Sequence, residues 1–176
     1  MDETQLSLRL RRLRVMAFDV DGVLTDGRLW YTEDGGEMKA FDARDGHGMK
    51  MLRDGGLKIA IITSRRSAIV ERRARELGVH YCFQGVPAKL PAFNELLGEL
   101  GETAECAGFM GDDLLDLPVL TSAGLAATVP DAPASVRERA HWVSSRPGGR
   151  GAVRELCELI LSAQGQLERL TARYLE

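Results

Sequence analysis

The chain has 176 residues, of which 44% are hydrophobic and 28% are charged, a composition typical of one globular domain with a single core. The formal net charge is −3, so no general attraction to nucleic acid or to an anionic membrane surface is expected. The length suits one domain, which we expect to cover residues 1–176. No apolar run approaches the ~20 residues needed to span a bilayer.

Short apolar runs alternate with helical patterns along the chain. The predicted strands, in chain order, are Arg14–Asp19, Leu57–Thr63, Val79–Phe83, Glu105–Met110, Gly124–Val129 and His141–Ser144. The predicted helices are Gly46–Asp54, Ser67–Leu77, Lys89–Leu100, Leu114–Ser122, Ala134–Ala140 and Gly151–Ser162. This alternation predicts an α/β fold with a doubly wound, Rossmann-like parallel sheet, in which ligands bind beyond the carboxyl ends of the strands.

One segment, at about residues 28–41, breaks this alternation. Two strand-like runs, Arg28–Thr32 and Glu37–Phe41, flank turn-forming residues and predict a β-hairpin that projects from the sheet. The large side chains expected to be poorly buried in a lone subunit are Leu29, Trp30, Tyr31, Met38 and Phe41.

Two groups of carboxylates each follow a predicted strand. Asp19 and Asp21 stand in the motif DVDGVLT, and Asp112, Asp113 and Asp116 stand in the motif GDDLLD. Either motif alone is also compatible with a turn and a helix N-cap. Since close carboxylates repel each other, the two motifs together favour a site for a hard cation such as Mg²⁺.

Donors for a phosphate follow two further strand ends. Thr63, Ser64 and Arg65 come between the second strand and a helix, where hydroxyls and backbone N–H groups can hold phosphate oxygens. Lys89 opens the next helix and can neutralise both a phosphate and a neighbouring carboxylate.

These four features, DVDGVLT, Thr63, Lys89 and GDDLLD, resemble in order the four motifs of the haloacid dehalogenase-like phosphohydrolase superfamily. The resemblance is closer to one family, the 3-deoxy-D-manno-octulosonate 8-phosphate (KDO-8-phosphate) phosphatases. The motifs that carry it are FDARDGHG, KIAIITSRRS, FQGVPAKL, FMGDDLLDLPV and GGRGAVRE.

The resemblance implies a Mg²⁺-dependent phosphatase that works through an aspartyl-phosphate. Asp19 would attack phosphorus, and Asp21 would protonate the leaving sugar oxygen and then deprotonate water. Asp19, the backbone carbonyl of Asp21, and Asp112 would hold the Mg²⁺. The product KDO would serve lipopolysaccharide precursor biosynthesis.

Further roles follow from the same resemblance. Thr63 and Lys89 would hold the transferring phosphoryl group, while Asp113 and Asp116 would orient the metal's water ligands and Lys89. Ser64 and Arg65 would contact the substrate. Ser64 stands where many relatives carry glycine, a change that bears on substrate fit rather than on chemistry.

The intervals between the motifs leave no room for a cap domain, so a lone subunit would expose its site to water. The resemblance implies a homotetramer in which hairpins join and C-terminal tails, from about residue 162 to 176, reach neighbouring sites. Arginine suits bidentate binding of a sugar-acid carboxylate, and Arg150, flanked by Arg146 and Arg154, is assigned to substrate binding.

Three alternatives remain open. The substrate could be a related sugar acid, such as a nine-carbon ketodeoxy acid 9-phosphate. The chain could resemble response-regulator receivers, although these lack DVDGVLT after the first strand. It could also be a non-catalytic oligomerisation module, which the intact acid set disfavours.

The expected location is the cytoplasm. The first residues lack the apolar stretch of a signal peptide. The cysteines, Cys82, Cys106 and Cys157, are scattered and show no paired spacing, which indicates a reducing compartment and small core side chains.

Overall fold

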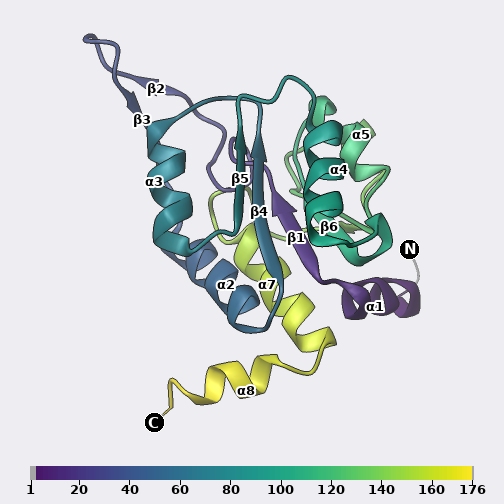
Figure 1. Ribbon diagram of the computed structural model, residues 1–176. Coiled ribbons are helices and arrows are strands. Elements are labelled where there is room, and N and C mark those ends of the chain that lie inside the picture. The colour runs from purple at the N-terminus through teal and green to yellow at the C-terminus, as the bar shows by residue number, and fades with distance from the viewer. Residues whose placement is uncertain (1–2, 176) are drawn as a thin grey trace.

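A six-stranded, fully parallel sheet forms the centre of the computed structural model, which describes residues 3–175 (Figure 1). The strands, in spatial order, are β5 (Tyr81–Gln84), β4 (Lys58–Thr63), β1 (Val15–Phe18), β6 (Ala107–Met110), β7 (Leu125–Thr128) and β8 (Trp142–Val143). The chain runs outward from β1 to β5 and then crosses to β6, so the winding reverses between β1 and β6. All six predicted strands and the doubly wound α/β sheet are confirmed.

Helices cover both faces of the sheet, as its buried central strands require. On one face lie α2 (Ala43–Asp54), α3 (Ala68–Leu77) and α7 (Ala152–Ala163), and on the other lie α4 (Lys89–Leu100) and α5 (Leu117–Leu120) (Figure 1). The remaining helical elements are α1 (Glu3–Arg12), η1 (Ala104–Cys106), η2 (Leu114–Asp116), α6 (Ala134–Arg137) and α8 (Leu167–Ala172). Among residues 3–175, no helix combines the length and apolar character needed to cross a bilayer.

Helix α2 begins earlier than the sequence predicts. It starts at Ala43, where the Asp42 side chain accepts a hydrogen bond from the backbone N–H of Arg44. Gly46 and Gly48 lie inside the helix, at positions where neighbouring elements approach it closely. A Cβ at Gly48 would lie only 3.1 Å from the backbone of α7.

Three other expectations also need correction. The helix predicted at Leu114–Ser122 is split, because a 3₁₀ turn at residues 114–116 precedes the four-residue α5. The predicted tail from about residue 162 contains α8, whose Leu170 is buried, while residue 176 lies outside the described residues. Of the three cysteines expected in the core, Cys157 is buried and Cys82 is exposed.

The predicted hairpin is formed by β2 (Trp30–Tyr31) and β3 (Glu37–Met38), an antiparallel pair that projects away from the main sheet (Figure 1). Four of its five large apolar side chains are exposed, namely those of Leu29, Trp30, Tyr31 and Met38. Phe41 differs from the expectation, because it is half-buried against the core and lies under the Arg73 guanidinium.

The GGRGAVRE segment supports the loop after β1 from within the same subunit. Gly149 donates a backbone hydrogen bond to the Val23 carbonyl at 2.9 Å. Gly148 lies so close that an added Cβ would be 1.7 Å from the Gly22 carbonyl oxygen. Buried Asp45 of α2 accepts backbone hydrogen bonds from the first turn of α7, at 3.2 and 2.8 Å. The loop after β1 therefore rests on a firmly anchored segment.

This packing makes a direct prediction for Gly148→Ala. The added methyl group meets backbone rather than a flexible side chain, so the free energy of unfolding should fall by at least about 2 kcal/mol. The matched control is Gly98→Ala in α4, where an added Cβ meets nothing within 4 Å. That change should be neutral or stabilise the protein by up to about 1 kcal/mol. Urea unfolding of both variants checks the prediction, and equal stabilities would contradict it.

Candidate active site

A pocket of about 250 Å³ opens at the carboxyl ends of β1, β4 and β6, beside the point where the winding of the sheet reverses. Nine of the ten residues predicted for the site line it, and Arg150 is the exception. The full lining is Asp19, Asp21, Gly27, Thr63, Ser64, Arg65, Lys89, Asp112, Asp113, Leu115 and Asp116. The sheet therefore brings together side chains that lie far apart in the sequence.

Lys89 forms a buried, two-armed ion pair at the floor of this pocket. Its Nζ lies 2.6 Å from Asp19 Oδ2 and 2.6 Å from Asp116 Oδ1. Burial alone would lower the pKa of Lys89, but the charges of Asp19 and Asp116 outweigh that effect and raise it. The lysine therefore stays charged and fixes one oxygen of each carboxylate.

Asp116 has no oxygen left for another ligand. Its Oδ2 accepts hydrogen bonds from the backbone N–H groups of Asp112 and Asp113, at 2.9 and 3.1 Å. Asp113 is exposed and accepts a hydrogen bond from the backbone N–H of Leu114, which caps the 3₁₀ turn. Asp116 thus shapes the loop after β6 and orients Lys89.

Asp19 and Asp112 have the character of cation ligands. The Oδ1 atom of Asp112 is buried without a hydrogen-bond partner. Burial and the charges of Asp19 and Asp116 raise the pKa of Asp112 to about 8. Burial and Asp116 also raise the pKa of Asp19 to about 6, against the opposing effect of Lys89. Oxygens of Asp19, Asp112 and Asp116 lie within 4.8 Å of one another. Because both Asp116 oxygens already have partners, Asp19 and Asp112 are the side chains that can take a hard cation here.

Gly22 allows this convergence. It adopts a left-handed backbone with φ of 91°, and a Cβ there would lie 2.0 Å from Asp112 Oδ2. Any side chain at this position would therefore displace Asp112 from the site.

The charge balance of the pocket also requires a cation before a phosphate can enter. Five carboxylates line it against two cationic side chains, those of Lys89 and Arg65. A phosphate dianion would be repelled by this surplus of negative charge. Divalent Mg²⁺, which prefers a few carboxylates together with water and phosphate, would offset most of this surplus negative charge.

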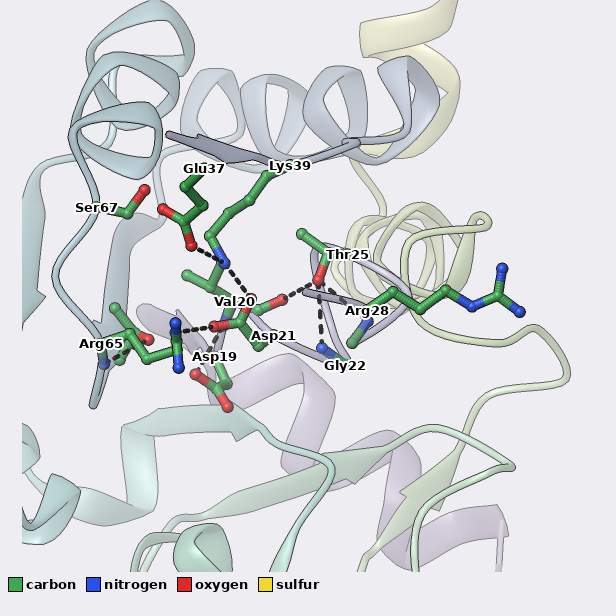
Figure 2. Close-up of polar contacts among 12 residues, drawn as sticks. Asp19, Val20, Asp21, Gly22, Thr25, Arg28, Glu37, Lys39, Arg65 and Ser67 are labelled. Atoms are coloured by element: carbon green, nitrogen blue, oxygen red, sulfur yellow. Dashed lines mark hydrogen bonds and ion pairs between the residues drawn. The ribbon is translucent and has the colours of Figure 1, made fainter. Parts of the chain in front are cut away.

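Asp21 lies at the pocket wall, held between two cations (Figure 2). Its Oδ1 is paired with the Nζ of Lys39, and its Oδ2 lies 3.8 Å from Nε of Arg65. No sequence pattern predicted the Lys39 contact, because this lysine belongs to the hairpin and to no strand-end motif. Asp19 is fixed separately, since its Oδ1 accepts a hydrogen bond from the Val20 N–H at 2.7 Å.

Thr63, Ser64 and Arg65 form the β4 side of the pocket. Thr63 is buried at the strand end, and its hydroxyl oxygen lies 3.5 Å from the backbone N of Arg65, at the limit of a hydrogen bond. The Arg65 guanidinium donates to the Tyr31 hydroxyl at 2.6 Å. The hairpin therefore reaches the rim of the pocket in its own subunit.

The three arginines in and near the GGRGAVRE segment do not line this pocket. Arg150 is exposed, with its nearest carboxylate oxygen on Asp26 at 3.7 Å. Arg146 and Arg154 border a different surface pocket, and Arg154 pairs with Glu158 at 2.7 Å. A substrate contact by Arg150 stays a prediction, because Arg150 does not line the pocket of its own subunit.

Comparison with known proteins gives a consistent result, although no family model matches the chain. The chain is 44% identical to 3-deoxy-D-manno-octulosonate 8-phosphate phosphatase KdsC of Yersinia pestis, over 93% of this chain and 87% of that protein. The Moraxella catarrhalis phosphatase of the same name, solved with magnesium, phosphate and KDO, is 39% identical, with a TM-score of 0.96 and coverage of 98% and 99%. The cobalt-bound Haemophilus influenzae enzyme is 40% identical, with a TM-score of 0.91 and coverage of 96% and 99%.

The raised pKa values predict how Mg²⁺ binding depends on pH. Both carboxyls hold their protons more tightly in the folded, metal-free protein than in the unfolded chain. The stabilising contribution of these two carboxyls to the metal-free protein should therefore be lost as pH rises from about 4 through 8. Mg²⁺ competes with these protons, so the rise in Tm at saturating Mg²⁺ should be at least about twofold larger at pH ~8 than at pH ~5.

Thermal unfolding with and without Mg²⁺ at both pH values provides the measurement. Asp112→Asn serves as the control, because it removes the ligand with the most strongly raised pKa and should abolish most of the pH dependence. An equal or larger Mg²⁺ effect at the lower pH in the parent protein would show that these carboxyls do not bind the metal.

Proposed function

Because the chain belongs to the 3-deoxy-D-manno-octulosonate 8-phosphate phosphatase family, we propose that it hydrolyses KDO-8-phosphate to KDO and phosphate with Mg²⁺ as cofactor. The observation that carries this proposal is the pairing of Asp19 with Lys89 beside the unpartnered oxygen of Asp112. That arrangement supplies a fixed nucleophile and a cation site in one pocket. The product would feed lipopolysaccharide precursor biosynthesis.

We assign the first half-reaction to Asp19 and Asp21. An Asp19 oxygen forms a bond to phosphorus as the bond from phosphorus to the sugar oxygen breaks. Asp21, in its protonated form, gives its proton to that departing oxygen. In the second half-reaction Asp21 takes a proton from water, whose oxygen bonds to phosphorus as the Asp19–phosphorus bond breaks. The products are KDO, phosphate and the original enzyme.

The remaining pocket residues hold the phosphoryl group. The Lys89 ammonium and the Thr63 hydroxyl can donate to its oxygens, which supports their assignment as phosphoryl ligands. Asp19, Asp112 and the backbone carbonyl of Asp21 are proposed to hold Mg²⁺. When bound, the metal offsets negative charge between the nucleophile and the phosphate.

Substrate choice tests the proposed function. The kcat/KM for KDO-8-phosphate should exceed that for glucose 6-phosphate by at least about a hundredfold, or ~2.7 kcal/mol of transition-state discrimination. The kcat/KM for a nine-carbon ketodeoxy acid 9-phosphate, measured in the same assay, distinguishes the proposed substrate from the related nine-carbon sugar acid. Comparable values for glucose 6-phosphate would refute a sugar-acid substrate, and a preference for the nine-carbon ester would reassign it. No turnover of any ester would favour a non-catalytic module.

We further propose a homotetramer whose hairpins join and whose sites are covered by neighbouring subunits. The exposed apolar side chains of Leu29, Trp30, Tyr31 and Met38 support this assembly, because an uncovered apolar hairpin promotes association. Arg150 is exposed and pairs with Asp26 at 3.7 Å, and we propose that it contacts the carboxylate of a neighbouring subunit's substrate in the assembly. A cytoplasmic location remains our proposal, supported by the three free cysteines.

The assembly has a direct test in solution. Light scattering should give about four times the chain mass of 19.3 kDa. Trp30→Ser combined with Met38→Ser should yield smaller species, because these two residues face each other across the hairpin and are each about half exposed. Leu8→Ser, at another exposed leucine, is the matched control and should leave the mass unchanged. A fully active monomer would contradict the proposal.

A further inference from the structure

The side chain of Lys39 is shielded from solvent in a way that is rare for a lysine, although the residue as a whole is only partly buried. It follows β3 in a hairpin whose apolar side chains are mostly exposed, yet its own side chain is only 1% exposed. Lysine is almost never fully buried unless it is paired, because removing its charge from water is costly. A specific set of partners must therefore hold it.

Those partners are two carboxylates. The Lys39 ammonium contacts Asp21 Oδ1, and it lies 3.3 Å from Glu37 Oε1 of the same hairpin (Figure 2). The other oxygen of Asp21 faces Arg65. Asp21 lines the pocket, whereas Lys39 and Glu37 do not. Lys39 thus approaches Asp21 from outside the pocket that holds the phosphoryl-transfer residues.

We propose that Lys39 is a positioning residue, which holds the carboxyl group of Asp21 in the orientation needed for proton transfer to the leaving oxygen. The inference rests on the proposed phosphatase function, in which Asp21 is the acid. A short side chain such as that of aspartate has two rotatable bonds, and an ion pair at one oxygen restricts both. Glu37 holds the Lys39 ammonium in turn, so the hairpin contacts the proposed acid Asp21 through one buried side chain.

If Asp21 is the acid, its loss should affect alkyl and aryl phosphate esters differently, whereas a general loss of structure should affect both alike. The leaving group of an alkyl ester such as KDO-8-phosphate is a strongly basic alkoxide, which needs a proton from Asp21 as its bond to phosphorus breaks. The phenolate of 4-nitrophenyl phosphate is far less basic and leaves without that proton. Loss of proton transfer should therefore affect kcat/KM for the alkyl ester far more than for the aryl ester.

The experiment compares Lys39→Met with the parent enzyme on both esters at saturating Mg²⁺. We expect kcat/KM for KDO-8-phosphate to fall by about a hundredfold and that for 4-nitrophenyl phosphate by less than about fivefold. Lys39→Arg, which keeps the charge, should recover most of the loss. Lys58→Met, at an exposed lysine that begins β4, is the matched control and should match the parent.

A double-variant cycle with Asp21→Asn completes the test. If Lys39 acts through Asp21, adding Lys39→Met to Asp21→Asn should change kcat/KM by less than about twofold. Equal losses on the two esters, additive losses in the double variant, or full activity of Lys39→Met would each overturn the proposal. If Lys39→Met fails to fold, the same comparison is made with Glu37→Gln added, which removes the unpaired carboxylate.

Parent activity on KDO-8-phosphate tests the proposed function separately. If the parent enzyme hydrolyses a different alkyl phosphate instead, that ester replaces KDO-8-phosphate in the comparison. The Lys39 proposal is then tested by comparing the loss of kcat/KM on the alkyl ester with the loss on the aryl ester.

Discussion

The site depends on one buried lysine shared between two carboxylates. Lys89 fixes Asp19 from one side and Asp116 from the other, and Asp116 in turn holds the loop that carries Asp112. Removing one member of such a buried network leaves an uncompensated charge, which typically costs about 3–5 kcal/mol. The charge of Lys89 cannot balance the five carboxylates that line the pocket. The pocket therefore favours binding of a divalent cation.

The fold makes this concentration of charge possible by bringing three strand ends together. Strands β1 and β6 are adjacent and end in register, with Phe18 beside Met110, so their acidic loops meet directly. Two close contacts then position the loop after β1. The carboxylate of Asp112 packs against Gly22, and Gly148, in the segment that leads into α7, packs against the backbone of the loop. Burial supplies the low-polarity surroundings in which these charges act strongly.

Much of this was predictable from the sequence, because β-branched apolar runs followed by acids mark strand ends in a parallel sheet. The order of motifs predicted Asp19, Thr63, Lys89 and Asp112 as one group, and they line one pocket. Local patterns failed where tertiary contacts decide the outcome. The helix predicted from Gly46 begins three residues earlier, and its glycines allow close packing against α3 and α7. The ion pair of Lys39 depends on how the hairpin folds back toward the sheet, which no local spacing encodes.

The central claim is that Asp19 becomes phosphorylated during turnover. Acid quenching of the enzyme during hydrolysis of KDO-8-phosphate, followed by borohydride reduction, converts an aspartyl phosphate into homoserine, which peptide mass spectrometry can locate. We predict homoserine at position 19, dependent on substrate and Mg²⁺, and an unmodified Asp21. Homoserine at another acidic residue, or none at position 19 while turnover proceeds, would contradict the account.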